Sequence, residues 1–351
     1  MASPLWLLTW WGVFGDGRRL RVWTFWRGDE LVGVAPLCLR RHWYPPGIPY
    51  RRLELLGSGE DEADEICSDY LGVVAAPGEE EAVARAFLDA LDEGGWDELL
   101  LPAMRGDGAM TTAISGELGA RGWSLAVDRS RACPYIPLPA TWEAYLAQLS
   151  SSHRYLVNRS LRDFDAWAKT VGPVRLEVAE DAAGLAQGRA ILAGLHGERW
   201  RADGSDGVFA SPRFRAFHDA VMPALMAREE LELLWLTVGD TPIAAVYSLV
   251  WRGRTLFYQS GRRVDLPAKL RPGIVLHAHA IRRAIGLGRR EYDFLAGESR
   301  YKTQLALATR PLASLRATRS LLRETARGLV SSVKVVIRSK RGAVSPGGDA
   351  P

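Results

Sequence analysis

The chain has 351 residues, of which 47% are hydrophobic and 25% charged, a composition typical of soluble globular proteins. This length suggests two domains, and the longest apolar runs are too short to span a bilayer. No signal peptide is predicted, so we expect a cytoplasmic protein. The formal net charge is +4, but residues 310–351 alone carry nine basic and two acidic side chains. The remainder is slightly acidic and gives no indication of DNA binding.

The first 140 residues alternate strands and helices. A β-hairpin is predicted from 21–27 and 31–40, because a polar turn at Gly28 and Asp29 separates two runs of β-forming residues. Glutamates after a Pro-Gly pair indicate the start of the first helix. Further strands are predicted at 53–57, 70–75, 96–103 and 123–128, and helices at 79–92 and 108–120.

A similar order of elements follows in the second half. Turns of the Gly-Asp and Arg-Gly type divide residues 231–261 into a three-stranded meander. Helices are predicted at 141–149, 151–170, 181–199, 212–228 and 274–287. Strands are predicted at 174–180, 231–238, 242–251, 255–261, 291–295 and 311–317. The sequence therefore predicts an α/β fold of two related domains, residues 1–140 and 141–320.

The tail, residues 321–351, is expected to form one basic amphipathic helix at 321–342 and then a disordered Gly- and Pro-rich end. Its apolar residues fall on one helical face and its basic residues on the other. This pattern fits either an interfacial helix that touches a membrane or a helix that packs against the second domain.

Pro272 and Gly273 stand between the meander and the helix predicted at 274–287. Amides at a helix N-terminus that is reached through a glycine form an anion site suited to a phosphate. The same two residues also make an ordinary helix start. The order of meander, glycine turn, helix, Gly-x-Gly, strand and polar stretch favours the anion site. A metal site is not expected, because His277 and His279 point to different sides of this helix and the three cysteines lack metal-like spacing.

Residues 239–306 resemble the GNAT acyltransferase superfamily, with YDFLAG…YK as the most specific block. More narrowly they resemble the CelD-type acetyltransferases associated with bacterial polysaccharide synthesis, which are similar to Fem-type aminoacyl ligases. The segments 2–17 and 31–40 match the family's N-terminal module, and GERWRADG at 197–204 matches a connecting stretch. The resemblance implies two tandem GNAT-like domains with mixed central sheets. The chain begins almost on SPLW, so the first domain is expected to be truncated at its start.

The resemblance implies an enzyme that moves an acetyl or other short acyl group from acetyl-CoA or another acyl-CoA to an amine or hydroxyl. The implied acceptor is a small molecule or saccharide, in polysaccharide or cell-envelope synthesis. In this fold the thioester enters a gap between two splayed strands, and the amine attacks it directly. Such a reaction uses a base, an acid for the thiolate and a donor to the carbonyl oxygen. Two alternatives stay open: a Fem-like ligase that takes an aminoacyl group from tRNA, and a non-catalytic scaffold of a polysaccharide-synthesis complex.

The catalytic candidates follow the pyrophosphate-binding helix and are expected to face the mouth of the gap. Asp293 would bind the acceptor amine or act as the base; alternatively it is a structural carboxylate that caps the backbone of Gly297 or Tyr301. Glu298 is a second base candidate or a solvated loop acid. Tyr301 would protonate the leaving thiolate, or would pack with its hydroxyl outward.

The binding candidates are implied by the same resemblance. The donor pyrophosphate is expected at the amides of Gly273, Ile274 and Val275, with Arg271 as charge partner, although the superfamily's longer glycine signature is lacking here. Lys302, one of five lysines, would hold a phosphate or carboxylate of the donor or acceptor, or would lie on the surface.

Four further residues are expected on the substrate side. Tyr258 and Gln259 lie on a strand that should wall the gap, with a plain core position as the alternative for Tyr258. Arg199 and Trp200 belong to the GERWRADG stretch. Three arginines on the helix at 151–170 form a solvated face, or collect a 3′-phosphate or an anionic acceptor: Arg154, Arg159 and Arg162.

Overall fold

The computed structural model describes residues 1–45, 47–297 and 299–319. Packing divides these residues into two units, each assembled from separate stretches of the chain. Unit 1 consists of Met1–Phe14, Gly57–Tyr70 and Arg129–Leu312, and unit 2 of Gly15–Leu56, Leu71–Asp128 and, within the described part, 313–319. These units differ from the two continuous segments expected on either side of residue 140. The tail helix predicted at 321–342 and the candidate Glu298 lie outside the described residues.

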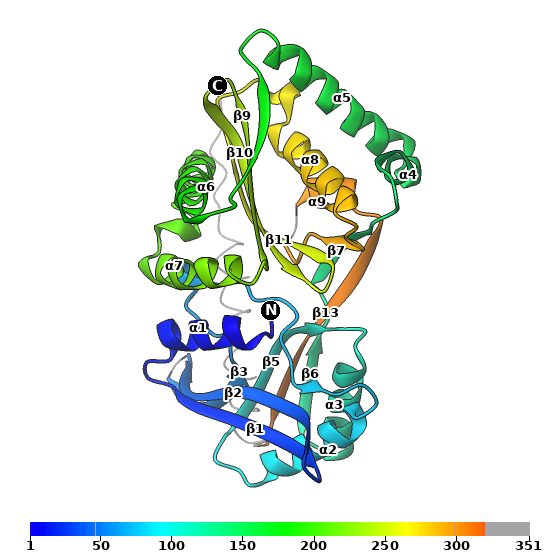
Figure 1. Cartoon of the computed structure of the whole chain (residues 1–351). Coiled ribbons are helices and arrows are strands. Elements are labelled where there is room, and N and C mark those ends of the chain that lie inside the picture. The colour runs from blue at the N-terminus through cyan, green and yellow to red at the C-terminus, as the bar shows by residue number, and fades with distance from the viewer. Residues whose placement is uncertain (46, 298, 320–351) are drawn as a thin grey trace, which may run out of the picture. The chain divides into compact units, whose positions relative to one another are not determined.

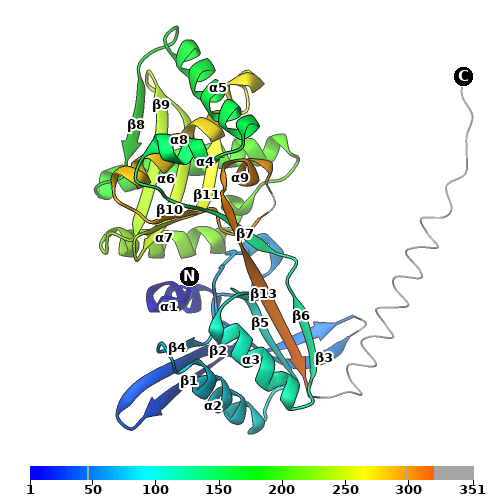
Figure 2. The ribbon, with the colours of Figure 1, turned by 90° about the vertical axis from the view of Figure 1, so that its right-hand side faces the viewer.

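Unit 2 is a sheet covered by two helices that lie side by side (Figure 2). Its strands run in the order β1-β2-β3-β5-β13, with β4 beside β2 and β6 beside residues 314–318 of β13. The hairpin predicted at its start forms, and Gly28 takes the positive φ of +59° that its turn requires. The elements are β1 Arg19–Arg27, β2 Glu30–Tyr44, β3 Ile48–Leu55, β4 Val74–Ala75, α2 Glu80–Asp92, β5 Glu98–Arg105, α3 Ala109–Ala120 and β6 Ser124–Asp128.

Unit 1 is built on a mixed sheet of order β7-β12-β11-β10-β9-β8, with residues 308–311 of β13 beside β7. Helices α6 and α7 cover one face of the meander, while α8 and α5 cover the other (Figure 1). The helices are α1 Pro4–Phe14, α4 Trp142–Gln148, α5 Ser151–Ala168, α6 Ala182–Ala202, α7 Pro212–Met226, α8 Pro272–Gly286 and α9 Arg300–Leu305. The strands are β7 Ala132–Pro137, β8 Val174–Val178, β9 Leu231–Val238, β10 Thr241–Trp251, β11 Arg254–Arg262, β12 Glu291–Asp293 and β13 Ala308–Thr318.

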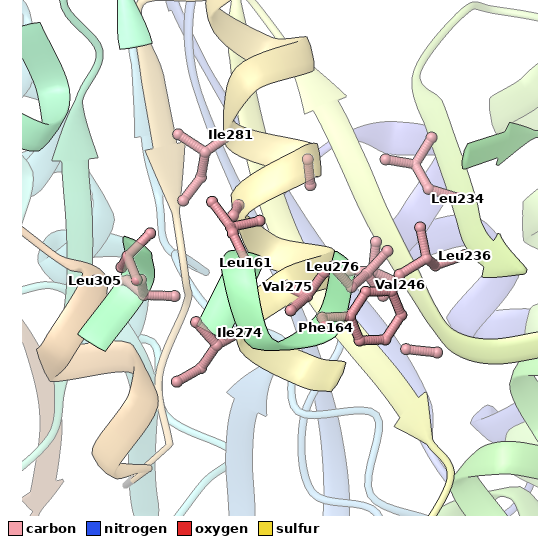
Figure 3. Packing of buried hydrophobic residues seen from close by; sticks show 14 of the residues in the cluster. Leu161, Phe164, Leu234, Leu236, Val246, Ile274, Val275, Leu276, Ile281 and Leu305 are labelled. Carbon is pink, nitrogen blue, oxygen red and sulfur yellow. The ribbon is translucent and has the colours of Figure 1, made fainter. Parts of the chain in front are cut away.

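The core of unit 1 fixes α5 and α8 to the sheet. Leu161 and Phe164 of α5 pack on Ile274 and Leu276 of α8 (Figure 3). Helix α5 is capped by Ser150, whose hydroxyl accepts a hydrogen bond from the His153 amide at 3.3 Å. The first turns of α8 are thereby held in one place.

Two neighbouring strands of unit 1 separate, as expected from the GNAT resemblance. β12 pairs in parallel with β11 only over Arg254–Leu256, whereas β11 continues to Arg262. The chain after β12 stays with β7 instead, because the Phe294 amide donates to the Pro134 carbonyl at 2.9 Å. The gap that opens beyond Leu256 positions the candidate site.

Candidate functional site

A cavity of about 640 Å³ lies beside the free part of β11, entirely within unit 1. Its walls are the end of β11 with the loop that follows, the first turns of α8, the C-terminal end of α6 and the start of α9. This volume is within the range of small-molecule sites in proteins. Of the binding and catalytic candidates, those in the lining are Arg199, Arg271, Gly273, Ile274 and Tyr301.

The start of α8 offers fewer free amides than expected. The amides of Ile274 and Val275 donate to the Arg271 carbonyl at 2.9 and 3.2 Å, and the Val275 side chain is fully buried. Pro272 has no N–H, so the first amide of the helix is that of Gly273, a residue that lines the cavity. Arg271 adopts a left-handed conformation with φ +42°, which aims the chain into the helix at a cost in strain.

Arginine side chains dominate the charge of this cavity. Arg199, Arg262, Arg263, Arg271 and Arg300 line it, whereas Asp203 is the acidic residue in its wall. Of these arginines, Arg263 pairs with a carboxylate, Asp265. No carboxylate of the described residues forms an ion pair with the other four. Guanidinium groups bind phosphates and carboxylates in bidentate geometry, so the cavity suits a ligand with several negative charges.

Two neutral polar groups stack in the wall of the cavity. The Tyr301 ring lies 5.1 Å from the His277 ring at an interplanar angle of 22°. Burial raises the pKa of Tyr301, so its hydroxyl keeps its proton at neutral pH. Burial lowers the pKa of His277 to about 3, so its imidazole is uncharged. Tyr301 is thus a protonated phenol in the wall of the cavity, and His277 carries no charge there.

Asp293 lies in the core instead of at the mouth. Its carboxylate accepts hydrogen bonds from the Tyr70 hydroxyl at 2.7 Å, the Leu295 amide at 2.7 Å and Arg310 Nη1 at 2.8 Å. Arg310 also pairs with Glu291, its Nη2 lying 2.9 Å from Oε2. Burial raises the pKa of Asp293 to about 6. This environment matches a structural carboxylate, which caps the Leu295 amide two residues further along the chain.

Lys302 is buried as well and does not lie on the surface. Its Nζ donates to the carbonyl oxygens of Ala296 at 2.6 Å and Leu295 at 3.4 Å, and burial lowers its pKa. The side chain is absent from the lining of the cavity. Lys302 therefore ties α9 to the loop that follows β12, and through that loop it positions Tyr301.

The substrate-side candidates are spread over unit 1. The Tyr258 hydroxyl donates to the Ile66 carbonyl at 2.6 Å, and the ring is buried, as the core alternative requires. Gln259 is half-buried on β11 without lining the cavity. Arg199 reaches the cavity, whereas the Trp200 indole N–H donates to a buried histidine.

Sequence reasoning did not single out the guanidinium groups of Arg262 and Arg300. Two features of the sequence could have indicated them. One is the pair of arginines that follows the buried strand, and the other is the arginine directly before Tyr301 and Lys302. Within the described residues, none of the helices has the length and apolar character needed to cross a membrane. Across that same part of the chain, no group of three or more His, Cys, Asp or Glu residues could hold a metal ion.

Part of the chain matches a known domain family, and the whole chain resembles several solved structures. Residues 151–303 match the model of an acetyltransferase (GNAT) domain, a segment that includes every residue lining the cavity. The crystal structure of FemX has 13% sequence identity and a TM-score of 0.63, with 94% of each chain covered. Among curated proteins, none matches this sequence.

Two further solved structures share the fold. The structure of L-PGS from Bacillus licheniformis has 10% identity and a TM-score of 0.53, covering 94% of this chain and 96% of that one. The C-terminal domain of a putative lysylphosphatidylglycerol synthetase from Agrobacterium fabrum has 9% identity and a TM-score of 0.52, covering 96% and 92%. The α/β, GNAT-like fold expected from the sequence is confirmed.

Proposed function

We propose that this protein is an acyltransferase that moves an acetyl or other short acyl group from acyl-CoA to an amine or hydroxyl. The observation that supports it most is the arginine-lined cavity at the gap between β11 and β12, inside the segment that matches the GNAT domain. Coenzyme A carries a pyrophosphate and a further phosphate, which suits a cavity wall where four arginines form no ion pair with a carboxylate of the described residues.

The chemistry follows from the groups in the wall. The donor phosphates bind the guanidinium groups and the Gly273 amide, and the thioester arm extends along β11. The acceptor nitrogen or oxygen attacks the carbonyl carbon and the C–S bond breaks. As the C–S bond breaks, the Tyr301 hydroxyl passes its proton to the sulfur while the proton lost by the acceptor reaches the Tyr301 oxygen through water, so no tyrosinate accumulates. General acid catalysis of this kind typically contributes about 10²–10⁴-fold.

The acceptor we propose is a small molecule or saccharide of polysaccharide or cell-envelope synthesis. This choice rests on the resemblance of the YDFLAG…YK block to CelD-type acetyltransferases. An aminoacyl group is the competing donor group, because the similarity to FemX extends over 94% of both chains.

Ligand-induced stabilisation tests the donor. A ligand that binds only the folded state at a hundredfold excess over Kd stabilises it by about 2.7 kcal/mol, so acetyl-CoA and free CoA should raise the melting temperature. Arg271→Gly removes a guanidinium from the cavity and suits the left-handed backbone, so it should weaken CoA binding by about tenfold without lowering the melting temperature.

Arg252→Gly is the matched control. Arg252 is also left-handed, with φ +46°, and lies in the turn between β10 and β11, away from the cavity lining. It should bind CoA as the wild type does. Unchanged melting curves with millimolar acetyl-CoA and CoA would exclude a CoA donor, and a shift with aminoacyl-tRNA alone would support the competing reading. Binding without thiol release across a panel of amines and saccharides would favour a scaffold.

A further inference from the structure

A second cavity, of about 300 Å³, adjoins the first one. Arg271 and Arg300 line both cavities, so a ligand bound in the first can pass these two side chains into the second. The remaining wall comes from α5, through His153, Tyr155 and Arg159, and from α9, through Gln304. The volume of this cavity is at the lower end of the range found for small-molecule sites. It therefore has room for one ring system and not for a whole coenzyme.

Charge and an aromatic ring meet in the second cavity. The Tyr155 side chain is 59% exposed and therefore contributes little to the core. The Arg159 guanidinium lies 6.0 Å from the centre of the Tyr155 ring. Arg159 pairs with Asp163 through one of its nitrogens at 3.3 Å, which leaves further N–H donors for a ligand. An exposed ring beside arginines is the arrangement that binds a nucleobase and its phosphate, because bases stack on aromatic faces.

The α5 wall is rigid, which a binding site requires. Tyr155 and Arg159 are four positions apart in the sequence, so they lie on one face of α5. On a neighbouring face, Leu161 and Phe164 are buried against α8 (Figure 3). The same packing therefore fixes both the start of α8 at the first cavity and the ligand-facing side of α5 at the second.

We propose that the second cavity binds the 3′-phosphorylated adenosine end of the acyl donor, with the base on Tyr155 and the 3′-phosphate on Arg159 and Arg300. The pyrophosphate then lies at Arg271, where the two cavities meet. This assignment rests on the proposed function, since it takes CoA as the donor. It adds a recognition element, α5, that lies outside the gap between the splayed strands.

Comparison of CoA with 3′-dephospho-CoA tests the assignment on the full chain. By calorimetry, the wild type should bind CoA about tenfold more tightly than dephospho-CoA, because a charge-assisted contact is lost. Arg159→Ala should lose most of this preference, because only Arg300 then remains at the 3′-phosphate, and its affinity for CoA should approach that of the wild type for dephospho-CoA. Tyr155→Ala should weaken both ligands by a similar factor, since each contains the adenine, and Tyr155→Phe should bind both as the wild type does.

Arg162→Ala is the matched control, because Arg162 is on the same helix and beside the same Asp163, yet lies outside the cavity. It should retain the preference for CoA. Equal binding of CoA and dephospho-CoA by the wild type would overturn the second subsite alone and leave the donor assignment standing. No binding of either ligand would overturn both. Loss of the preference in Arg162→Ala as well as in Arg159→Ala would also overturn the subsite, because any charge on α5 would then suffice.

Discussion

The Asp293 carboxylate holds together chain segments far apart in sequence. It accepts from Tyr70, from the Leu295 amide and from Arg310, all within unit 1. Arg310 has a second carboxylate partner in Glu291, so removing the charge of Asp293 does not leave the guanidinium without a partner. We therefore expect its contribution to be architectural, through the position of the loop that leads to α9.

Asp293→Asn separates architecture from catalysis. We expect the free energy of unfolding to fall by about 1–3 kcal/mol, the cost of poorly satisfied buried donors, while turnover per folded molecule stays near that of the wild type. Urea denaturation and thiol release from acetyl-CoA measure the two quantities. Glu291→Gln removes the other carboxylate that pairs with Arg310. It should also lower the free energy of unfolding and leave turnover unchanged. A variant with unchanged stability and a 10²–10⁴-fold lower kcat would instead make Asp293 the catalytic base.

Three helices of unit 1 each carry a buried neutral histidine: α6 His196, α7 His218 and α8 His277. Burial lowers their pKa values to about 4, 3 and 3. The unfolded chain takes up these protons below pH 6.5, whereas the folded protein does not until near pH 4. Because the unfolded state then binds more protons, the contribution of these histidines to stability should be complete above pH 6.5 and should fall as the pH decreases toward 4. Asp293 acts in the opposite direction between pH 6 and 4, because its pKa is raised to about 6.

Urea unfolding between pH 7.5 and 4.5 checks this expectation. Each such histidine contributes a slope of about 1.4 kcal/mol per pH unit. His277→Gln should be less stable at pH 7.5, since it loses the 3.0 Å contact of Nδ1 with the Tyr292 hydroxyl, but its stability should depend less on pH. If the free energy of unfolding of His277→Gln changes with pH as that of the wild type does, His277 does not contribute to the pH dependence of stability.

Most helices and strands could be predicted from the sequence where the spacing of hydrophobic residues and the turn residues indicate the same element. The meander β9–β11 and helix α8 form within a few residues of their expected bounds. Helix α1 was missed because its run of Trp and Leu has no polar face or cap, and β7 because its two prolines are atypical of a strand. The strand expected at 70–75 shrinks to two residues, since Tyr70 takes a left-handed φ of +57°.

The candidate site could be predicted only in part. Arg271 and Gly273 were identifiable because a Pro-Gly pair before a helix is a local signal, and both line the cavity. The engagement of the Ile274 and Val275 amides by the Arg271 carbonyl is a matter of local backbone geometry that residue types do not specify. The approach of Arg199, Arg262 and Arg300 depends on how three elements pack, which no local pattern contains.

At the scale of the whole molecule, unit 1 depends on residues from the beginning of the chain. Trp6 donates to the Ser68 hydroxyl at 2.9 Å and packs edge-on against Phe217, with ring centres 4.8 Å apart. Tyr258 donates to Ile66, and Asp293 accepts from Tyr70. A fragment that begins after residue 128 lacks Trp6, Ile66 and Tyr70. It therefore cannot form any of these contacts.

Residues 129–312 expressed alone should therefore fail to fold cooperatively, although they contain the GNAT-matching segment. We expect a broad thermal transition, dye binding by exposed apolar surface and weak near-ultraviolet dichroism, the signs of a loosely packed state. Coexpression of residues 1–128 with residues 129–319, which contain the whole of β13, should restore a sharp transition. A sharp transition of the fragment by itself would mean that the early residues are dispensable for unit 1.

Beyond Leu256, the edge of β11 that would face β12 has no strand beside it among the described residues. Main-chain N–H and C=O groups on such an edge can pair with a ligand arm that carries amides, as a short added strand. Pairing of this kind does not depend on which side chains the strand carries. If the proposed donor pairs with β11 in this way, its recognition tolerates changes in the side chains of the strand, provided that the strand still forms.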